Sequence, residues 1–198
     1  MAEIVQNIDI RSSLKEATAA LHDHVDRQFS LFDVRTQDGY SRILLAHHSA
    51  AIWYQPLFSE FVSAHVHVHA PDFLGMLSYD IAAAGLHPPE HSDQWRVSAN
   101  PSPATMTGLC YAVSGSRLGT TALYHKWSQS MPRAHPIHSS HFFRDREGLQ
   151  LWRDFLQWSA TLDFSRQEVT EAISGAVATF ELFSSAALRA EAIQLSAD

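Results

Sequence analysis

Apolar residues recur at three- and four-residue spacing over most of the chain, a pattern that predicts helices. In residues 12–27 the recurring apolar positions are Leu14, Ala17, Leu21 and Val25. Ser12 or Ser13 can cap this helix, because a serine hydroxyl accepts a hydrogen bond from a free backbone N–H of the first turn. The first long segment is therefore expected to be an amphipathic helix.

The same spacing predicts five more helices, over residues 40–63, 72–84, 104–127, 146–160 and 165–189. Pro56 is expected to kink or split the second helix, and Gly85 to end the third. Ser165, with Glu168 three residues later, forms a capping box at the start of the last. Residues 64–70, AHVHVHA, are the one candidate for a short strand. The expected fold class is all-α, a bundle of six or more helices.

Composition narrows the class of protein. The chain has 198 residues and a net charge of -7, which suits one domain over residues 1–198, with 1–10 as a flexible N-terminal segment. No basic run could neutralise phosphates, so we expect no nucleic-acid partner. The sequence shows neither a secretory signal nor an apolar run of membrane-spanning length. Cys110 is the single cysteine, which suits a reducing compartment. We expect a cytoplasmic protein that binds no membrane.

Thirteen histidines are unusual for this length. His22, flanked by apolar residues of the first helix and followed one turn later by Asp26, could point inward and ligate iron. From spacing alone, an exposed histidine near a helix end is the commoner case. Of His47 and His48, which are adjacent on the second helix, at most one is expected to face inward.

Two further histidine groups have the spacing of a loop rather than of a metal site. They are His65, His67 and His69 in one segment and His135, His138 and His141 in another. On a strand the first group could chelate zinc, but no acid or cysteine cluster accompanies it. We interpret both groups as incidental. Cys110 and the aromatic residues of the last two helices, Trp152, Phe155, Trp158, Phe180 and Phe183, are interpreted as core.

Gly115 and Gly119 stand four apart inside the predicted helix 104–127. Each interior glycine destabilises a helix by roughly 0.5–1 kcal/mol relative to alanine. Small residues at this spacing leave a groove, which admits either a second helix at close range or a flat ligand against the bare backbone. Together with an inward His22, the pair suggests a planar metallocofactor between two helices.

Three longer stretches resemble the heme oxygenase family. LKEATAALHDHVD (14–26) is similar to its proximal helix, GSRLGT (115–120) to its glycine-rich distal helix, and FFRDREGLQLWRDFLQW (142–158) to a later helical segment. GYSRILL, SYDIAAAGL and ATFELF also resemble their counterparts, so the similarity spans nearly the whole chain. The pattern is most similar to the bacterial branch that supplies biliverdin to bacteriophytochromes.

The resemblance implies a fold with heme between a proximal helix and a kinked distal helix. It implies His22 as the iron ligand, Asp26 as the acid one turn later, and catalytic roles for Gly115, Ser116 and Gly119. Ser116 replaces the aspartate that many members carry. The further heme-binding residues that it implies are Lys15 and Arg153 at the two propionates, with Tyr111, Arg117 and Thr120 on the distal helix.

The activity implied by the resemblance is oxidative cleavage of heme to biliverdin with loss of CO and ferrous iron. Heme is then both substrate and cofactor, dioxygen is consumed, and electrons come from a separate reductase or ferredoxin. A bacteriophytochrome is the implied recipient of the product. Three alternatives stay open: a non-catalytic heme-binding protein, a relative using another small molecule or a dinuclear metal site, and a helical interaction module.

Overall fold

The computed structural model describes residues 9–88, 95, 100–129 and 136–193. Over these ranges the chain forms seven α-helices and two short turns of π- and 3₁₀-helix, with no strand among the described residues. The α-helices are α1 (Ile10–Ser30), α2 (Gln37–Phe61), α3 (Phe73–Ala83), α4 (Pro103–Ser128), α5 (His141–Arg144), α6 (Glu147–Ser159) and α7 (Arg166–Ala192); the turns are η1 (Val62–Val66) and η2 (Pro136–His138). The predicted all-α fold class is confirmed.

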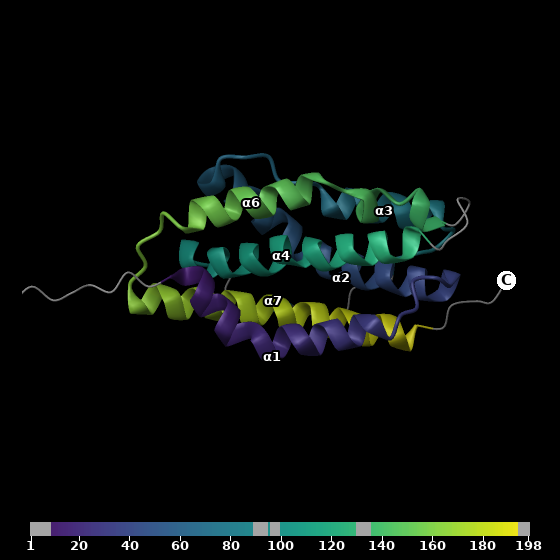
Figure 1. The fold of residues 1–198 in the computed structure, drawn as a ribbon, viewed down its shortest axis with the longest axis horizontal. Helices are drawn as coiled ribbons and strands as arrows, with labels where there is room; N and C mark the ends of the chain where they lie inside the picture. Colours follow the sequence, from purple (N-terminus) through teal and green to yellow (C-terminus); the bar gives the residue numbers. More distant parts are fainter. Residues whose placement is uncertain (1–8, 89–94, 96–99, 130–135, 194–198) are drawn as a thin grey trace, which may run out of the picture.

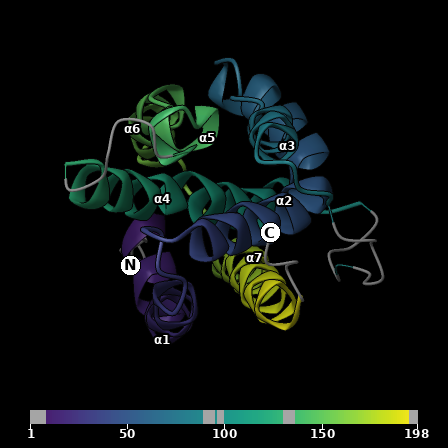
Figure 2. The same ribbon diagram turned by 90° about the vertical axis from the view of Figure 1, so that its right-hand side faces the viewer.

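The long helices run along the longest axis of the molecule, as Figure 1 shows. Seen along that axis in Figure 2, α1 and α7 lie on one side, α2 and α4 in the middle, and α3, α5 and α6 on the other side. The most extensive helix contacts join α4, α1 and α2 to α7. None of the described helices has both the length and the apolar character needed to cross a membrane. This arrangement sets α1 and α4 in neighbouring layers with their flanks covered by other helices.

Local hydrogen bonding determines where α1 and α7 begin. Asp9 caps α1 and accepts from the Arg11 N–H, while the Ser12 hydroxyl donates to the Asp9 carboxylate. The prediction that Ser12 or Ser13 caps this helix is wrong, because both serines already lie inside its first turn. At α7 the predicted capping box is confirmed, with Ser165 and Glu168 exchanging hydrogen bonds. Gly85, with φ +71, follows the end of α3 as predicted.

Helix α2 continues from Gln37 to Phe61 through Pro56, so of the two effects expected of this proline the split is wrong and the kink stays a prediction. Burial of Tyr54 and Phe58 on either side offsets the hydrogen bond that proline cannot make. His47 and His48 are also both buried, at 8% and 5% exposure. The expectation that at most one faces inward fails because α2 lies in the middle layer and is covered on more than one face.

Residues 64–70 form no strand. They continue from α2 as the π-helical turn η1, and His67 then adopts a left-handed conformation with φ 60. His65 packs against the Phe61 ring with centroids 4.6 Å apart. No group of three or more histidine, cysteine or acidic side chains gathers in the described part of the chain. His135 and most of the predicted flexible segment 1–10 lie outside the described residues.

Helices α4 and α7 cross in direct backbone contact. A Cβ added at Gly108 of α4 would lie 1.8 Å from the carbonyl oxygen of Ala172, and one added at Gly175 of α7 would lie 2.0 Å from that of Thr105. Distances this short leave no room for any side chain on either glycine. The crossing therefore depends on the two glycines, and it holds the first half of α4 against α7.

Replacing Gly108 with alanine is expected to lower the free energy of unfolding by about 2 kcal/mol. The added methyl group overlaps the Ala172 carbonyl, and overpacking of this kind outweighs the gain in helix propensity. Urea unfolding followed by circular dichroism measures the change. A Gly108→Ala protein as stable as the wild type would contradict the close crossing.

Candidate heme site

A cavity of about 560 Å³ lies between α1 and α4 and extends to α2, α6 and α7. Its volume is in the range of small-molecule and cofactor sites. Several residues predicted from the sequence line it, namely His22, Asp26, Tyr111, Gly115, Ser116, Gly119 and Thr120. The structure thus brings the predicted iron ligand and the glycine pair to one cavity, although about ninety residues separate them.

His22 enters the cavity from α1. The buried positions Leu14, Thr18 and Val25 fix the inner face of this helix, and His22 lies beside that face, one turn after Thr18. Its ring meets the edge of Phe180 at 5.6 Å, and its Nδ1 atom lies 3.2 Å from the Asp26 Oδ2 atom. This pairing favours a proton on Nδ1 and leaves the Nε2 lone pair available to a metal.

Gly115 and Gly119 present bare backbone to the cavity from α4, which runs without interruption through both. A Cβ added at Gly119 would meet nothing within 4 Å, and one added at Gly115 would lie 3.6 Å from the Trp152 ring. Gly119 therefore borders open space, whereas Gly115 faces the Trp152 ring of α6. The close contact between helix backbones is made by a different glycine of α4, Gly108. The kink expected in this helix stays a prediction.

The hydroxyl groups next to the glycines are engaged within α4. Ser116 Oγ donates to the Val113 carbonyl at 2.7 Å, and Thr120 Oγ1 donates to the Ser116 carbonyl at 3.2 Å. Because each hydroxyl has one proton, both face the cavity as acceptors in this arrangement. Tyr111 is half-buried; burial raises the pKa of its hydroxyl, while a hydrogen bond with Thr18 of α1 lowers it.

Arg117 lies outside the cavity, contrary to its predicted contact with heme. Side chains two residues apart on a helix point about 200° away from each other, so Arg117 faces away from Gly115 and Gly119. Its guanidinium is buried between the rings of Phe73 and Phe142, at 4.9 and 4.3 Å, and donates to the Phe142 carbonyl at 2.6 Å. Asp145 completes the site, with its Oδ2 atom 3.4 Å away. Arg117 therefore joins α4 to α5 in the core.

Lys15 and Arg153 are exposed residues of α1 and α6, and neither is among the residues lining the cavity. Arg153 donates to the Gln150 side chain at 3.3 Å. Both side chains are long enough to reorient over several ångströms. Their assignment to the two propionates stays a prediction.

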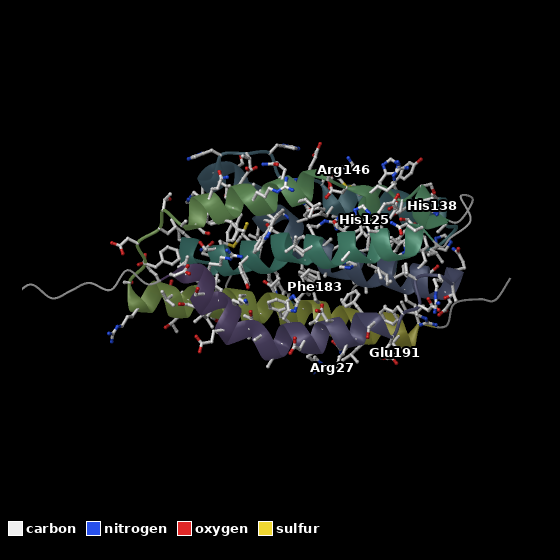
Figure 3. The ribbon with its side chains drawn as sticks, in the orientation of Figure 1. Arg27, His125, His138, Arg146, Phe183 and Glu191 are labelled. Carbon is white, nitrogen blue, oxygen red and sulfur yellow. The ribbon has the colours of Figure 1, made fainter. Side chains whose placement is uncertain are left out.

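Sequence reasoning missed much of the cavity wall. Aromatic rings cover it, and the rings are those of Phe29, Phe143, Trp152, Phe180 and Phe183. Three of these rings were interpreted as core, since a cofactor wall and a core face have the same helical spacing. Figure 3 shows Phe183 in the interior, next to α7 and toward α4. His47 also lines the cavity; its signal in the sequence is a polar residue within the apolar stripe of α2.

A solved structure of known function shares this architecture. The heme oxygenase of Neisseria meningitidis, reported in crystal structures with NO and CO bound, superposes with a TM-score of 0.68 over 96% of each chain, at 18% identity. The chain has a heme oxygenase-like fold. An identity this low shows the fold alone. No protein-family model matches the sequence, and no curated protein matches it closely enough to be significant.

The cavity fits the group that a heme oxygenase-like fold implies. Heme is a flat, largely apolar ring that needs an axial ligand for its iron. The cavity offers His22 for the iron, aromatic side chains for the ring edges and, at Gly119, backbone with open space where a side chain would stand. Among the described residues that line it there is no lysine or arginine, and the open rim is where water can solvate the heme carboxylates.

Proposed function

We propose that this protein is a heme oxygenase that cleaves heme to biliverdin with release of CO and ferrous iron. The observation that carries the proposal is that His22 of α1 and the bare backbone of Gly115 and Gly119 of α4 line the same cavity. A groove without side chains admits a flat ligand to the helix backbone. The resemblance of residues 14–26 and 115–120 to the proximal and distal helices of heme oxygenases supports the same assignment.

Each wall of the cavity has a distinct role in this proposal. His22 binds iron through Nε2, and Asp26, paired with Nδ1, holds the tautomer and the ring orientation. The aromatic rings exclude water from the inner part of the cavity, while the hydroxyls of Ser116 and Thr120 accept hydrogen bonds from water above the glycines. When bound, heme supplies both the redox-active iron and the macrocycle that is oxidised.

The partners follow from this chemistry. Dioxygen is the oxidant, and electrons come from an external reductase or ferredoxin. Ser116, at the position where many family members carry aspartate, supports the bacteriophytochrome-associated branch. In that branch the biliverdin becomes the chromophore of a bacteriophytochrome.

Spectroscopy of the purified protein tests the proposal. Hemin added in stoichiometric amount is expected to give the Soret band of a histidine-ligated heme. Ascorbate, or a reductase with its electron donor, is then added under air, and the Soret band should decay as biliverdin absorption grows. A Soret band that persists under these conditions identifies the main alternative, a non-catalytic heme-binding protein. If no Soret band forms, the proposed function is wrong.

A further inference from the structure

The cavity has an exposed rim and a buried inner end. At the rim Leu118 is 49% exposed and the Asp26 side chain 66% exposed. At the inner end lie Ile43, Phe143 and Phe183, each at most 3% exposed. His47 is the polar side chain among these inner residues. A ligand that fills the cavity therefore presents one edge to solvent and the opposite edge to His47.

The His47 imidazole is enclosed by aromatic rings. Phe29 and Phe142 each lie 4.9 Å from it between centroids, and Phe183 lies 5.8 Å away. Within the ranges that the structure describes, neither ring nitrogen of His47 has a hydrogen-bond partner, whereas the Nε2 atom of the adjacent His48 lies 3.2 Å from the Ser78 hydroxyl. The ring nitrogens of His47 are not among the fully enclosed side-chain atoms that lack a partner, so they border the cavity that this residue lines. A polar group without a protein partner at the apolar end of a cavity points to a ligand atom.

His47 is neutral in this environment. Burial lowers the pKa of His47 to about 3, and the nearby charge of Arg117 acts in the same direction. A neutral imidazole has one N–H donor and one lone pair. It can therefore donate a hydrogen bond to an uncharged oxygen, and it does not need a carboxylate.

Intact heme has no oxygen to offer at the inner end. Its oxygen atoms belong to two carboxylates on one side of the macrocycle, and these fit only at the rim, where water solvates them. Opening the macrocycle changes this, because the two pyrrole rings that flanked the lost carbon each gain a carbonyl oxygen. The open-chain product can therefore place an acceptor at the inner end, and the substrate cannot.

We propose that His47 is a product-binding residue, which donates a hydrogen bond to a terminal-ring carbonyl oxygen of an open-chain tetrapyrrole bound in this cavity. The proposal rests on the proposed function for the identity of the ligand. In this proposal the cavity binds the product more favourably than the substrate, and the difference depends on the His47 side chain. His47 leaves its N–H unpaired when the intact macrocycle is bound and pairs it when the ring is open.

Binding titrations of three variants test the proposal. Hemin and biliverdin are titrated separately into the wild type, His47→Leu and His47→Gln, with quenching of tryptophan fluorescence as the readout. His47→Leu is expected to weaken biliverdin binding about tenfold, the effect of one buried hydrogen bond, and to leave hemin binding within about twofold. His47→Gln keeps a donor and should retain most of the biliverdin affinity. His48→Gln, next in the chain but outside the cavity lining, is the matched control.

An unchanged ratio of biliverdin to hemin affinity in His47→Leu overturns the proposal, and so does an equal loss of both affinities. Nitrogen-15 NMR of the wild-type imidazole provides a second measurement that does not depend on the stability of a variant. Its N–H proton should move downfield when biliverdin saturates the protein, and an unmoved signal also overturns the proposal. Failure of the wild type to bind hemin instead contradicts the proposed function, so the two failures are distinguishable.

Discussion

Replacing His22 with alanine is expected to abolish the spectrum of histidine-ligated heme and to weaken hemin binding by at least about a hundredfold. Loss of a residue that merely supports a metal-ligating histidine lowers metal affinity about 10–100-fold, so loss of the ligand itself should exceed that range. Absorbance titration with hemin measures the affinity, and resonance Raman spectroscopy detects the iron–histidine bond. Exogenous imidazole should restore ligation in the variant, because it fills the space that the side chain leaves.

Stability measurements separate the role of His22 in binding from a role in folding. The His22 side chain is 54% exposed in the structure, so His22→Ala should change the free energy of unfolding by no more than about 0.5 kcal/mol. His24→Ala is the matched control, since His24 is exposed on the same helix and is not among the residues lining the cavity. A His22→Ala protein that keeps the wild-type heme spectrum contradicts the assignment of the ligand.

Local interactions explain which helices the sequence predicted well. The capping box of Ser165 and Glu168 joins groups three residues apart, so the residues that form it are adjacent in the sequence. The start of α1 was misplaced by a few residues because Asp9, Ser12 and Ser13 all carry capping groups. The split expected at Pro56 was wrong for a different reason. Its local effect is opposed by tertiary burial of its neighbours, which no short window of sequence contains.

The candidate site was predictable where a residue has few alternative uses. A histidine in an apolar helical setting and a glycine pair inside a helix are unusual, and both lie on the cavity. Arg117 was misassigned because it lies between two glycines in the sequence, whereas on the helix its side chain points away from them. The aromatic wall was not foreseen as a site, because Phe180 and Phe183 of α7 meet α1 and α4 only in the folded chain.

Replacing Gly119 with leucine is expected to weaken hemin binding by at least about a hundredfold while the protein stays as stable as the wild type. A Cβ at this position meets nothing within 4 Å, so the longer side chain enters the cavity and occupies the space that a flat ligand needs. Steric overlap between the leucine side chain and the ligand that makes the binding free energy less favourable by about 3 kcal/mol corresponds to a hundredfold loss of affinity. Hemin titration measures the binding, and urea unfolding measures the stability.

Gly119→Ala separates the effect of bulk from the effect of losing glycine. Alanine is expected to raise the free energy of unfolding by about 0.5–1 kcal/mol, since it favours the helix and its Cβ meets nothing within 4 Å. Ala20→Leu places the same leucine side chain at an exposed position of α1 outside the cavity lining, and should leave hemin binding unchanged. If the leucine variant at 119 binds hemin as the wild type does, the bare backbone of α4 is not a wall of the heme site. If the leucine variant folds but no longer binds hemin, Gly119 is required for the space that its missing side chain leaves. Binding of the ligand then explains why α4 contains a glycine that destabilises the helix.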